Sequence, residues 1–66
     1  MKNWLKLERA RIDITQLELA QAIGTSVQTI NSIEKYRFYP SLLIALKIAR
    51  YFDKPLEEIF VLEDLD

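Results

Sequence analysis

Four residues at helical spacing in the segment 26–34 would share one mostly polar face of a helix, and none of them is acidic. They are Val27, Gln28, Asn31 and Ser32. Amides such as those of Gln28 and Asn31 are suited to bidentate pairing with adenine, and a valine can pack on a thymine methyl group. This face therefore predicts a helix that enters the major groove of double-stranded DNA. The alternative is an ordinary solvated helix face.

Hydroxyl groups and cations lie at both ends of this face. They can donate hydrogen bonds to phosphate, and contacts of that kind position a protein on DNA without reading its sequence. The candidates for contact with the DNA backbone are Thr25, Ser26, Thr29, Lys35 and Arg37.

Two short helices joined by a turn must position these side chains. Thr15 followed three residues later by Glu18 is a capping box at the start of the first helix. Ser26 supplies the N-cap of the second. Gly24 between them can take the left-handed conformation that turns the chain. Apolar residues at helical spacing form the matching inner faces of the two helices: Leu19, Ala20, Ile23, Ile30 and Ile33.

The rest of the chain predicts three more helices and an all-α, five-helix domain over residues 1–66. The first helix is expected at 3–12, with Leu5 and Ile12 facing inward. The fourth opens at Ser41 after a proline and runs to residue 52. Its expected core face follows i, i+3, i+4 spacing and consists of Leu42, Ala45, Leu46, Ala49 and Phe52. The fifth is expected at 55–60, and residues 61–66 are left open between a helical extension, a short strand and disorder.

The segment 15–34 resembles the helix-turn-helix of the Cro/phage-repressor (XRE) family. The whole chain is similar to compact bacterial regulators that consist of this domain alone. The matching positions are Thr15-Gln16, Leu19-Ala20, Gly24, Ile30, Ile33 and Glu34, followed by 40–42, 45–49 and 56–60.

The resemblance implies roles for particular residues. It places Gln16 beside a DNA phosphate and assigns base reading to the outer face of the helix at 26–34. It also implies that Arg9 pairs with Glu34, which would hold this recognition helix at a fixed angle.

The chain departs from the family where several helices end. Family members often carry glycine after the first, third and fourth helices, where this chain has Asp13, Tyr36 and Asp53. Aspartate tolerates the left-handed conformation reasonably well, but a bulky tyrosine does not. The turn after Glu34 is therefore either strained or differently shaped.

Composition argues against several other classes of protein. The chain has no cysteine and no histidine, so the usual zinc sites and disulfides are excluded. A single glycine leaves no phosphate-binding loop, and no nucleophile or base is arranged for catalysis. We expect neither enzyme activity nor a cofactor or metal. The sequence shows no signal peptide and no membrane span, so we expect a cytoplasmic protein.

Charge is segregated along the chain, although the formal net charge is only −1. Residues 1–52 hold eight Lys or Arg against four Asp or Glu, a net +4, whereas residues 53–66 carry a net −5. A basic body with an acidic end suits a domain that faces DNA with its tail pointing away. Two solvated charged surfaces are the simpler alternative. The alternative to a DNA-binding regulator is an antitoxin-like module with the same fold, which would dock on a protein partner.

A second apolar stripe predicts association with another copy of the chain. Ile44, Ile48 and Tyr51 share one face of the fourth helix, and further apolar residues follow it. Ile48 and Ile59 can be explained more simply by packing of the fifth helix. We expect a sequence-specific transcriptional regulator, a repressor that binds a palindromic operator as a homodimer. Binding of that kind requires a two-fold interface. We expect that interface to contain Tyr51, Leu56 and Phe60, with Ile44 and Leu62.

Overall fold

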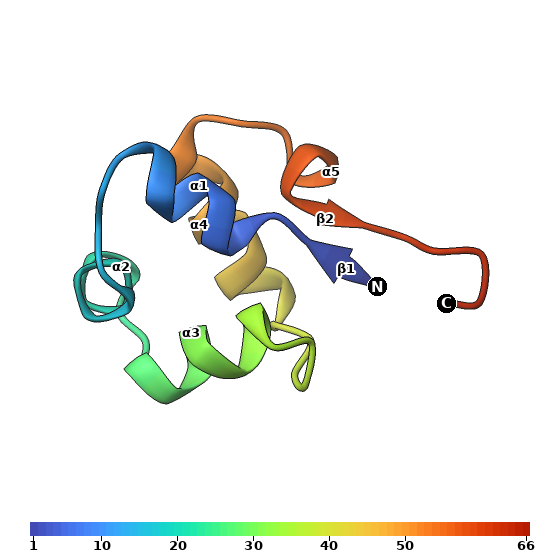
Figure 1. Ribbon diagram of the computed structural model, residues 1–66, viewed down its shortest axis with the longest axis horizontal. Coiled ribbons are helices and arrows are strands. Elements are labelled where there is room, and N and C mark those ends of the chain that lie inside the picture. Colours follow the sequence, from blue (N-terminus) through green and yellow to red (C-terminus); the bar gives the residue numbers. More distant parts are fainter.

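Five helices follow one another along the chain, and the segments at its two ends pair as short strands. The computed structural model describes residues 1–66 (Figure 1). Its elements are β1 (Lys2–Asn3), α1 (Leu5–Arg11), α2 (Gln16–Ile23), α3 (Val27–Glu34), α4 (Leu42–Phe52), α5 (Leu56–Ile59) and β2 (Phe60–Val61). The predicted five-helix fold is confirmed, as is the short strand that was one of the alternatives left open near the end of the chain.

The first helix starts later than predicted because the residues before it form a strand. β1 pairs antiparallel with β2, with Asn3 opposite Phe60. The Asn3 side chain joins two helices: its Oδ1 accepts from the Leu5 amide at 3.1 Å, and its Nδ2 donates to the Ile33 carbonyl at 2.9 Å. Ile12 is 51% exposed in the turn after α1, so its predicted inward position is wrong.

Local capping signals position α2 and α3 as the sequence predicts. Thr15 Oγ1 accepts from the Glu18 amide at 3.0 Å, and a Glu18 carboxylate oxygen accepts from the Thr15 amide at 2.9 Å. Ser26 Oγ accepts from the Thr29 amide at 3.1 Å. Gly24 ends α2 in the left-handed conformation, at φ 76°. The predicted helix-turn-helix is therefore present.

The turn after α3 keeps the conformation that glycine prefers. Tyr36 has φ 61°, and Asp13 and Asp53 have similar values of 55° and 54°. The Tyr36 amide donates to the Ile33 carbonyl at 3.0 Å, and the Arg37 amide donates to the carbonyl of residue 32 at 2.9 Å. This pair of bonds is the Schellman pattern at a helix end. Of the two alternatives for this turn, the strained one is realised.

Replacing Tyr36 with glycine should therefore stabilise the protein. The left-handed conformation costs a non-glycine residue about 1–2 kcal/mol, whereas the greater entropy loss of glycine on folding offsets roughly 0.5–1 kcal/mol of the gain. The Tyr36 side chain is 58% exposed, so little packing is lost. We expect Tyr36→Gly to raise the free energy of unfolding by up to about 1 kcal/mol, which is measured as a higher unfolding midpoint in urea. A lower midpoint would show that the ring packs more strongly than its exposure indicates.

The core lies between α2, α3 and α4 and is closed by α1 and α5. Its fully buried side chains are Leu5, Leu19, Ile30, Ile33, Ile48 and Ile59. Burial of Ile48 and Ile59 agrees with the simpler explanation given for them above. Phe60, predicted at a dimer interface, is instead 8% exposed and belongs to this core. It begins β2 directly after α5, and this position directs its ring inward.

The predicted core face of α4 is partly wrong. Leu42 and Leu46 are 70% and 49% exposed, whereas Ala45, Ile48 and Ala49 are buried. The helix has apolar residues on more than one face, so periodicity alone does not decide which face packs inward. Contacts with α2 and α5 select the face that contains Ile48.

No helix in the structure is both long enough and apolar enough to cross a membrane.

The two ends of the chain are also joined by charge. The Met1 amino group bonds the Asp66 carboxylate and lies 3.5 Å from Glu63 Oε1. The hydrogen bond that the amino group donates to Asp66 raises the pKa of the amino group to about 10. Both ends lie at the same side of the molecule, at the right of Figure 1.

Candidate nucleic-acid interface

The outer face of α3 is uncovered, and it holds the four side chains expected to read bases. Gln28 is exposed and the other three are half-buried. Together with Gln16 from the start of α2, these side chains line a shallow hollow: Val27, Gln28, Asn31 and Ser32. In Figure 1, α3 forms the lower edge of the molecule and no other element lies beneath it. The structure thus brings the expected base-reading residues and Gln16 into one surface.

An ion pair fixes the carboxyl end of α3 to α1. Arg9 Nε donates to Glu34 Oε2 at 2.6 Å and Arg9 Nη2 donates to Glu34 Oε1 at 3.0 Å. Arg9 Nη1 donates to the Ile14 carbonyl at 2.8 Å. The Arg9 and Glu34 side chains are only 14% and 4% exposed. The hydrogen bonds to Glu34 raise the pKa of Arg9 above its usual value. The bidentate geometry holds α1, the turn before α2 and the end of α3 together.

Gln16 connects this ion pair to the outer face of α3. Its Nε2 donates to Glu34 Oε1 at 3.1 Å, and its Oε1 accepts from Asn31 Nδ2 at 3.4 Å. From the sequence, Gln16 and Asn31 are expected to be separate contacts to DNA, and the hydrogen bond between them is not predicted. Residues 31 and 34 share one face of α3, and that spacing was the only available signal for it.

Donors flank the hollow on both sides. Ser26 Oγ and Thr29 Oγ1 lie 2.9 Å apart at the amino end of α3, beside the half-buried Thr25. At the other end, Lys35 and Arg37 are exposed and form no ion pair. Their positive charge is therefore not neutralised by the protein itself.

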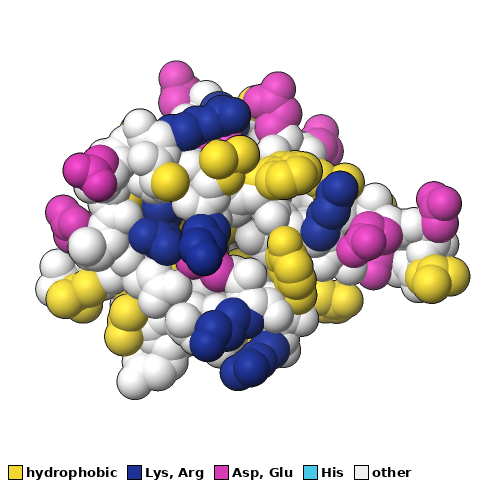
Figure 2. All heavy atoms as spheres, in the orientation of Figure 1, with side chains coloured by type: hydrophobic (Ala, Val, Ile, Leu, Met, Phe, Trp, Pro, Cys, Tyr) yellow, Lys and Arg dark blue, Asp and Glu magenta, His cyan; other side chains and the backbone are white.

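Charge is distributed unevenly over this side of the molecule. Figure 2 shows Lys and Arg side chains over the middle and the lower part of the face. Asp and Glu side chains gather along its edges and at the right, where the chain ends. Lys and Arg side chains also lie at the top and at the right, next to Asp and Glu, so the two charges are only partly separated on this face.

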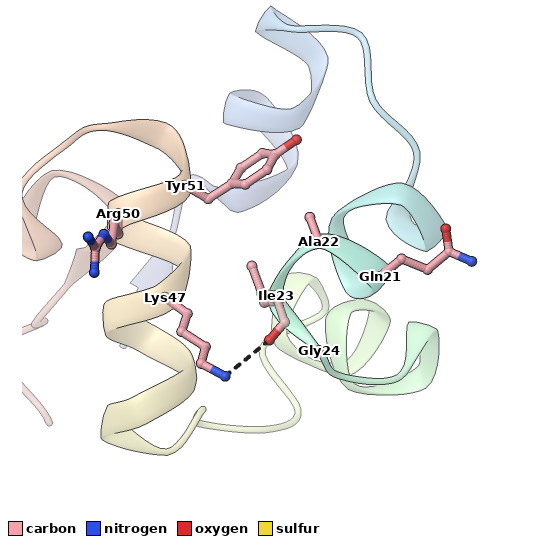
Figure 3. A pocket seen from close by; sticks show the side chains of 7 residues that line it. All are labelled: Gln21, Ala22, Ile23, Gly24, Lys47, Arg50 and Tyr51. Carbon is pink, nitrogen blue, oxygen red and sulfur yellow. Dashed lines mark hydrogen bonds between the residues drawn. The ribbon is translucent and has the colours of Figure 1, made fainter.

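A second hollow lies between the end of α2 and α4 (Figure 3). Lys47 reaches across it and donates to the Ile23 carbonyl at 3.5 Å. A lysine suits this place because the carbonyl end of a helix carries partial negative charge. Figure 3 shows Arg50 and Gln21 turned away from the hollow, so these polar groups do not converge on a ligand. The structure contains no cluster of carboxylates that could hold a metal ion.

Two capped helices joined by a left-handed glycine turn, with the polar face of the second uncovered, define a helix-turn-helix DNA-binding domain. The model of the helix-turn-helix family matches residues 5–59. The chain belongs to this family, in its Cro/phage-repressor (XRE) type.

Similar proteins span the same length. An uncharacterized HTH-type transcriptional regulator of Methanocaldococcus jannaschii is 50% identical over 64 residues, which cover 97% of each chain. One from Bacillus subtilis is 44% identical with the same coverage. Another, from Archaeoglobus fulgidus, is 41% identical over 97% of this chain and 90% of its own. The chain is a DNA-binding regulator of this family.

Proposed function

We propose that this regulator is a repressor that binds a palindromic operator as a homodimer, with α3 in the major groove. The observation that carries the proposal is the uncovered, acid-free face of α3, flanked by the unpaired cations Lys35 and Arg37. Amides and hydroxyls on such a face match the donors and acceptors of base edges. A protein bound there excludes other proteins from the same DNA, so occupancy alone is sufficient for repression.

Selection of bound DNA from a random pool tests this function directly. A recovered palindrome would support both sequence reading and two-fold symmetry. Recovery of no preferred sequence would contradict the proposal.

Gln28 should carry part of the sequence preference. Its side chain is exposed and makes no hydrogen bond within the protein, so it is free to pair with a base. Gln28→Ala should cost roughly 1–3 kcal/mol of specific binding and relax the preference at one operator position. Fluorescence anisotropy with operators altered at single positions measures both effects.

Lys35→Ala is the matched control for a contact with the DNA backbone. It should weaken binding to all sequences alike and reduce the salt dependence by about one released counterion. If Gln28→Ala left affinity and preference unchanged, α3 would not be the reading helix in the way proposed.

A homodimer provides the second set of contacts that operator binding needs. One recognition helix reads only a few base pairs, and two related copies read half-sites about 34 Å apart. The Cα atoms of one chain extend over 32 × 22 × 20 Å. Two copies side by side therefore have the right size to reach adjacent half-sites.

Apolar side chains on α4 and near the end of the chain offer a surface for the second copy. Tyr51 and Leu62 are 40% and 78% exposed, while Ile44 and Leu56 are half-buried at the edge of the core. Three leucines of the first two turns of α4 are exposed as well, and we include them in the proposed interface: Leu42, Leu43 and Leu46. Exposed apolar patches on small proteins are typical of interaction sites. We assign this surface to the dimer interface in place of Phe60.

Sedimentation at micromolar concentration should show a dimer, and Leu43→Glu should dissociate it. Leu43 is 63% exposed in the monomer, so the change leaves the core intact. A carboxylate buried without a partner costs several kcal/mol, so we expect the dissociation constant to rise about tenfold or more. Leu17→Glu is the control, because Leu17 is similarly exposed, at 54%, and is not one of the residues assigned to the interface. A wild-type protein that stays monomeric, even on operator DNA, would contradict the proposed assembly.

The acidic segment 53–66 favours one competing function, an antitoxin-like module that docks on a basic protein partner. The same fold can serve either purpose. DNA binding that weakens steeply with salt supports the regulator. A stable complex with another protein that excludes DNA would support the competing function.

A further inference from the structure

A chain of hydrogen bonds leads from Arg9 through Glu34 and Gln16 to Asn31, and the donor and the acceptor of each bond are fixed. A carboxylate only accepts hydrogen bonds, and Glu34 is almost fully buried with both oxygens bonded to Arg9. Gln16 can therefore approach Glu34 only with its amino group, at 3.1 Å. The carboxylate thereby fixes which way the Gln16 amide faces.

The orientation of the Gln16 amide in turn fixes the orientation of the Asn31 amide on α3. Its oxygen lies on the opposite side of the amide from its nitrogen and needs a donor, which Asn31 supplies through Nδ2 at 3.4 Å. Asn31 then keeps two groups for an external partner, its Oδ1 and the second hydrogen on Nδ2. Both are free of hydrogen bonds within the protein, on the face that lines the hollow with Gln28.

We propose that the Arg9–Glu34 ion pair, acting through Gln16, determines which DNA base Asn31 recognises. This inference rests on the proposed function, since it requires α3 to lie in the major groove. Adenine presents an N6 donor and an N7 acceptor, which match the two groups that Asn31 keeps. Guanine presents two acceptors at O6 and N7, and thymine presents an acceptor at O4, so each places an oxygen against Asn31 Oδ1.

An asparagine without this constraint can rotate its amide, point both Nδ2 hydrogens at the O6 and N7 acceptors of guanine, and move its Oδ1 away from them. The link to Gln16 removes that freedom, because rotation would bring two oxygens together. Glu34 and Gln16 are therefore positioning residues for specificity, although neither has to contact a base. Asn31 should read adenine first, with cytosine next, because the N4 donor of cytosine can still reach Oδ1.

A simple phosphate contact by Gln16 predicts a different outcome. Gln16 Nε2 has a second hydrogen that is not used by Glu34, so it can also donate to the DNA backbone. Loss of a backbone contact weakens binding to all sequences alike. Loss of orientation at Asn31 changes the preference at one operator position and leaves the other positions as they were.

Gln16→Met tests the inference, because methionine has a similar length and transmits no hydrogen bond. The operator selected by the wild type is made in four forms that differ at the position where Asn31→Ala loses its preference. The wild type should favour adenine over guanine there by about 10–100-fold, the range for a good bidentate pair. Gln16→Met should reduce this ratio to below about threefold, a loss of most of that discrimination. Lys35→Ala should leave the ratio unchanged while weakening binding to all four forms. Thermal melts of each variant confirm that it is folded.

A second variant tests the inference without changing residue 16, in case Gln16→Met alters the fold. Glu34→Gln keeps the shape of the side chain but offers Gln16 either an oxygen or a nitrogen. The direction of the Gln16 amide is then no longer fixed, and the same loss of the adenine preference is expected in the folded fraction.

The outcomes separate this inference from the function on which it rests. If Gln16→Met weakens all four operators equally and keeps the adenine preference, the inference is wrong and Gln16 is a phosphate contact only. A wild-type preference for guanine at this position would overturn it as well. If the wild type selects no sequence at all, the proposed function fails and the inference fails with it.

Discussion

Glu34→Ala is expected to lower the free energy of unfolding by about 3–5 kcal/mol, the typical loss when one partner of a buried ion pair is removed. The Arg9 side chain is only 14% exposed and directs two of its three hydrogen bonds to Glu34. Without Glu34, its charge stays largely buried with only the Ile14 carbonyl as an acceptor. A domain of this size has a total stability on the order of 3–10 kcal/mol. The variant should therefore lose from about a third to all of its stability and unfold at a much lower urea concentration.

Urea unfolding followed by circular dichroism measures this loss. Glu57→Ala is the control, because Glu57 is exposed and forms no ion pair, and it should change the stability by less than about 0.5 kcal/mol. Replacing both partners, as in Arg9→Met with Glu34→Leu, should recover much of the stability because no charge is left unpaired. An unchanged midpoint for Glu34→Ala would show that the pair is exposed to solvent or absent.

Local signals predicted the helix-turn-helix because they depend on neighbouring residues only. The capping box of Thr15 and Glu18 and the N-cap at Ser26 each join residues three apart, and the structure has both. The pairing of β1 with β2 joins residues almost a full chain length apart. A strand of two residues has no pattern of its own, so the sequence predicted a helix that began too early.

The face on which α4 packs could not be predicted for a related reason. Leu42 and Ile48 are equally apolar, and spacing fits either of two stripes along the helix. Contacts with other elements decide between the stripes, and they bury Ile48 and leave Leu42 exposed. The same holds for the candidate site: the base-reading face follows from spacing within α3, whereas the link between Gln16 and Asn31 crosses between two helices.

Glu8 is a charged residue that composition alone would place on the surface, yet it is only 5% exposed. Lys54, which follows α4, donates to Glu8 Oε2 at 2.7 Å, and Arg11 donates to the same oxygen at 3.3 Å. The side chain of Arg11 is 56% exposed, whereas that of Lys54 is 28% exposed. Lys54 is therefore the better-placed partner and the main reason that the buried carboxylate is tolerated.

Lys54→Met should lower the free energy of unfolding by about 3 kcal/mol, at the lower end for an unpaired buried charge because Arg11 remains as a weaker partner. Glu8→Gln should cost less, about 1 kcal/mol, since a neutral amide oxygen still accepts from Lys54. Lys6→Met is the control for the loss of an exposed cation.

Lys54 lies between α4 and α5, so its loss should also loosen the segment that carries Leu56 and Leu62 and weaken the proposed dimer. Denaturation and sedimentation of the same variants test both effects, and a Lys54→Met protein as stable as the Lys6→Met control would show that Arg11 alone neutralises Glu8.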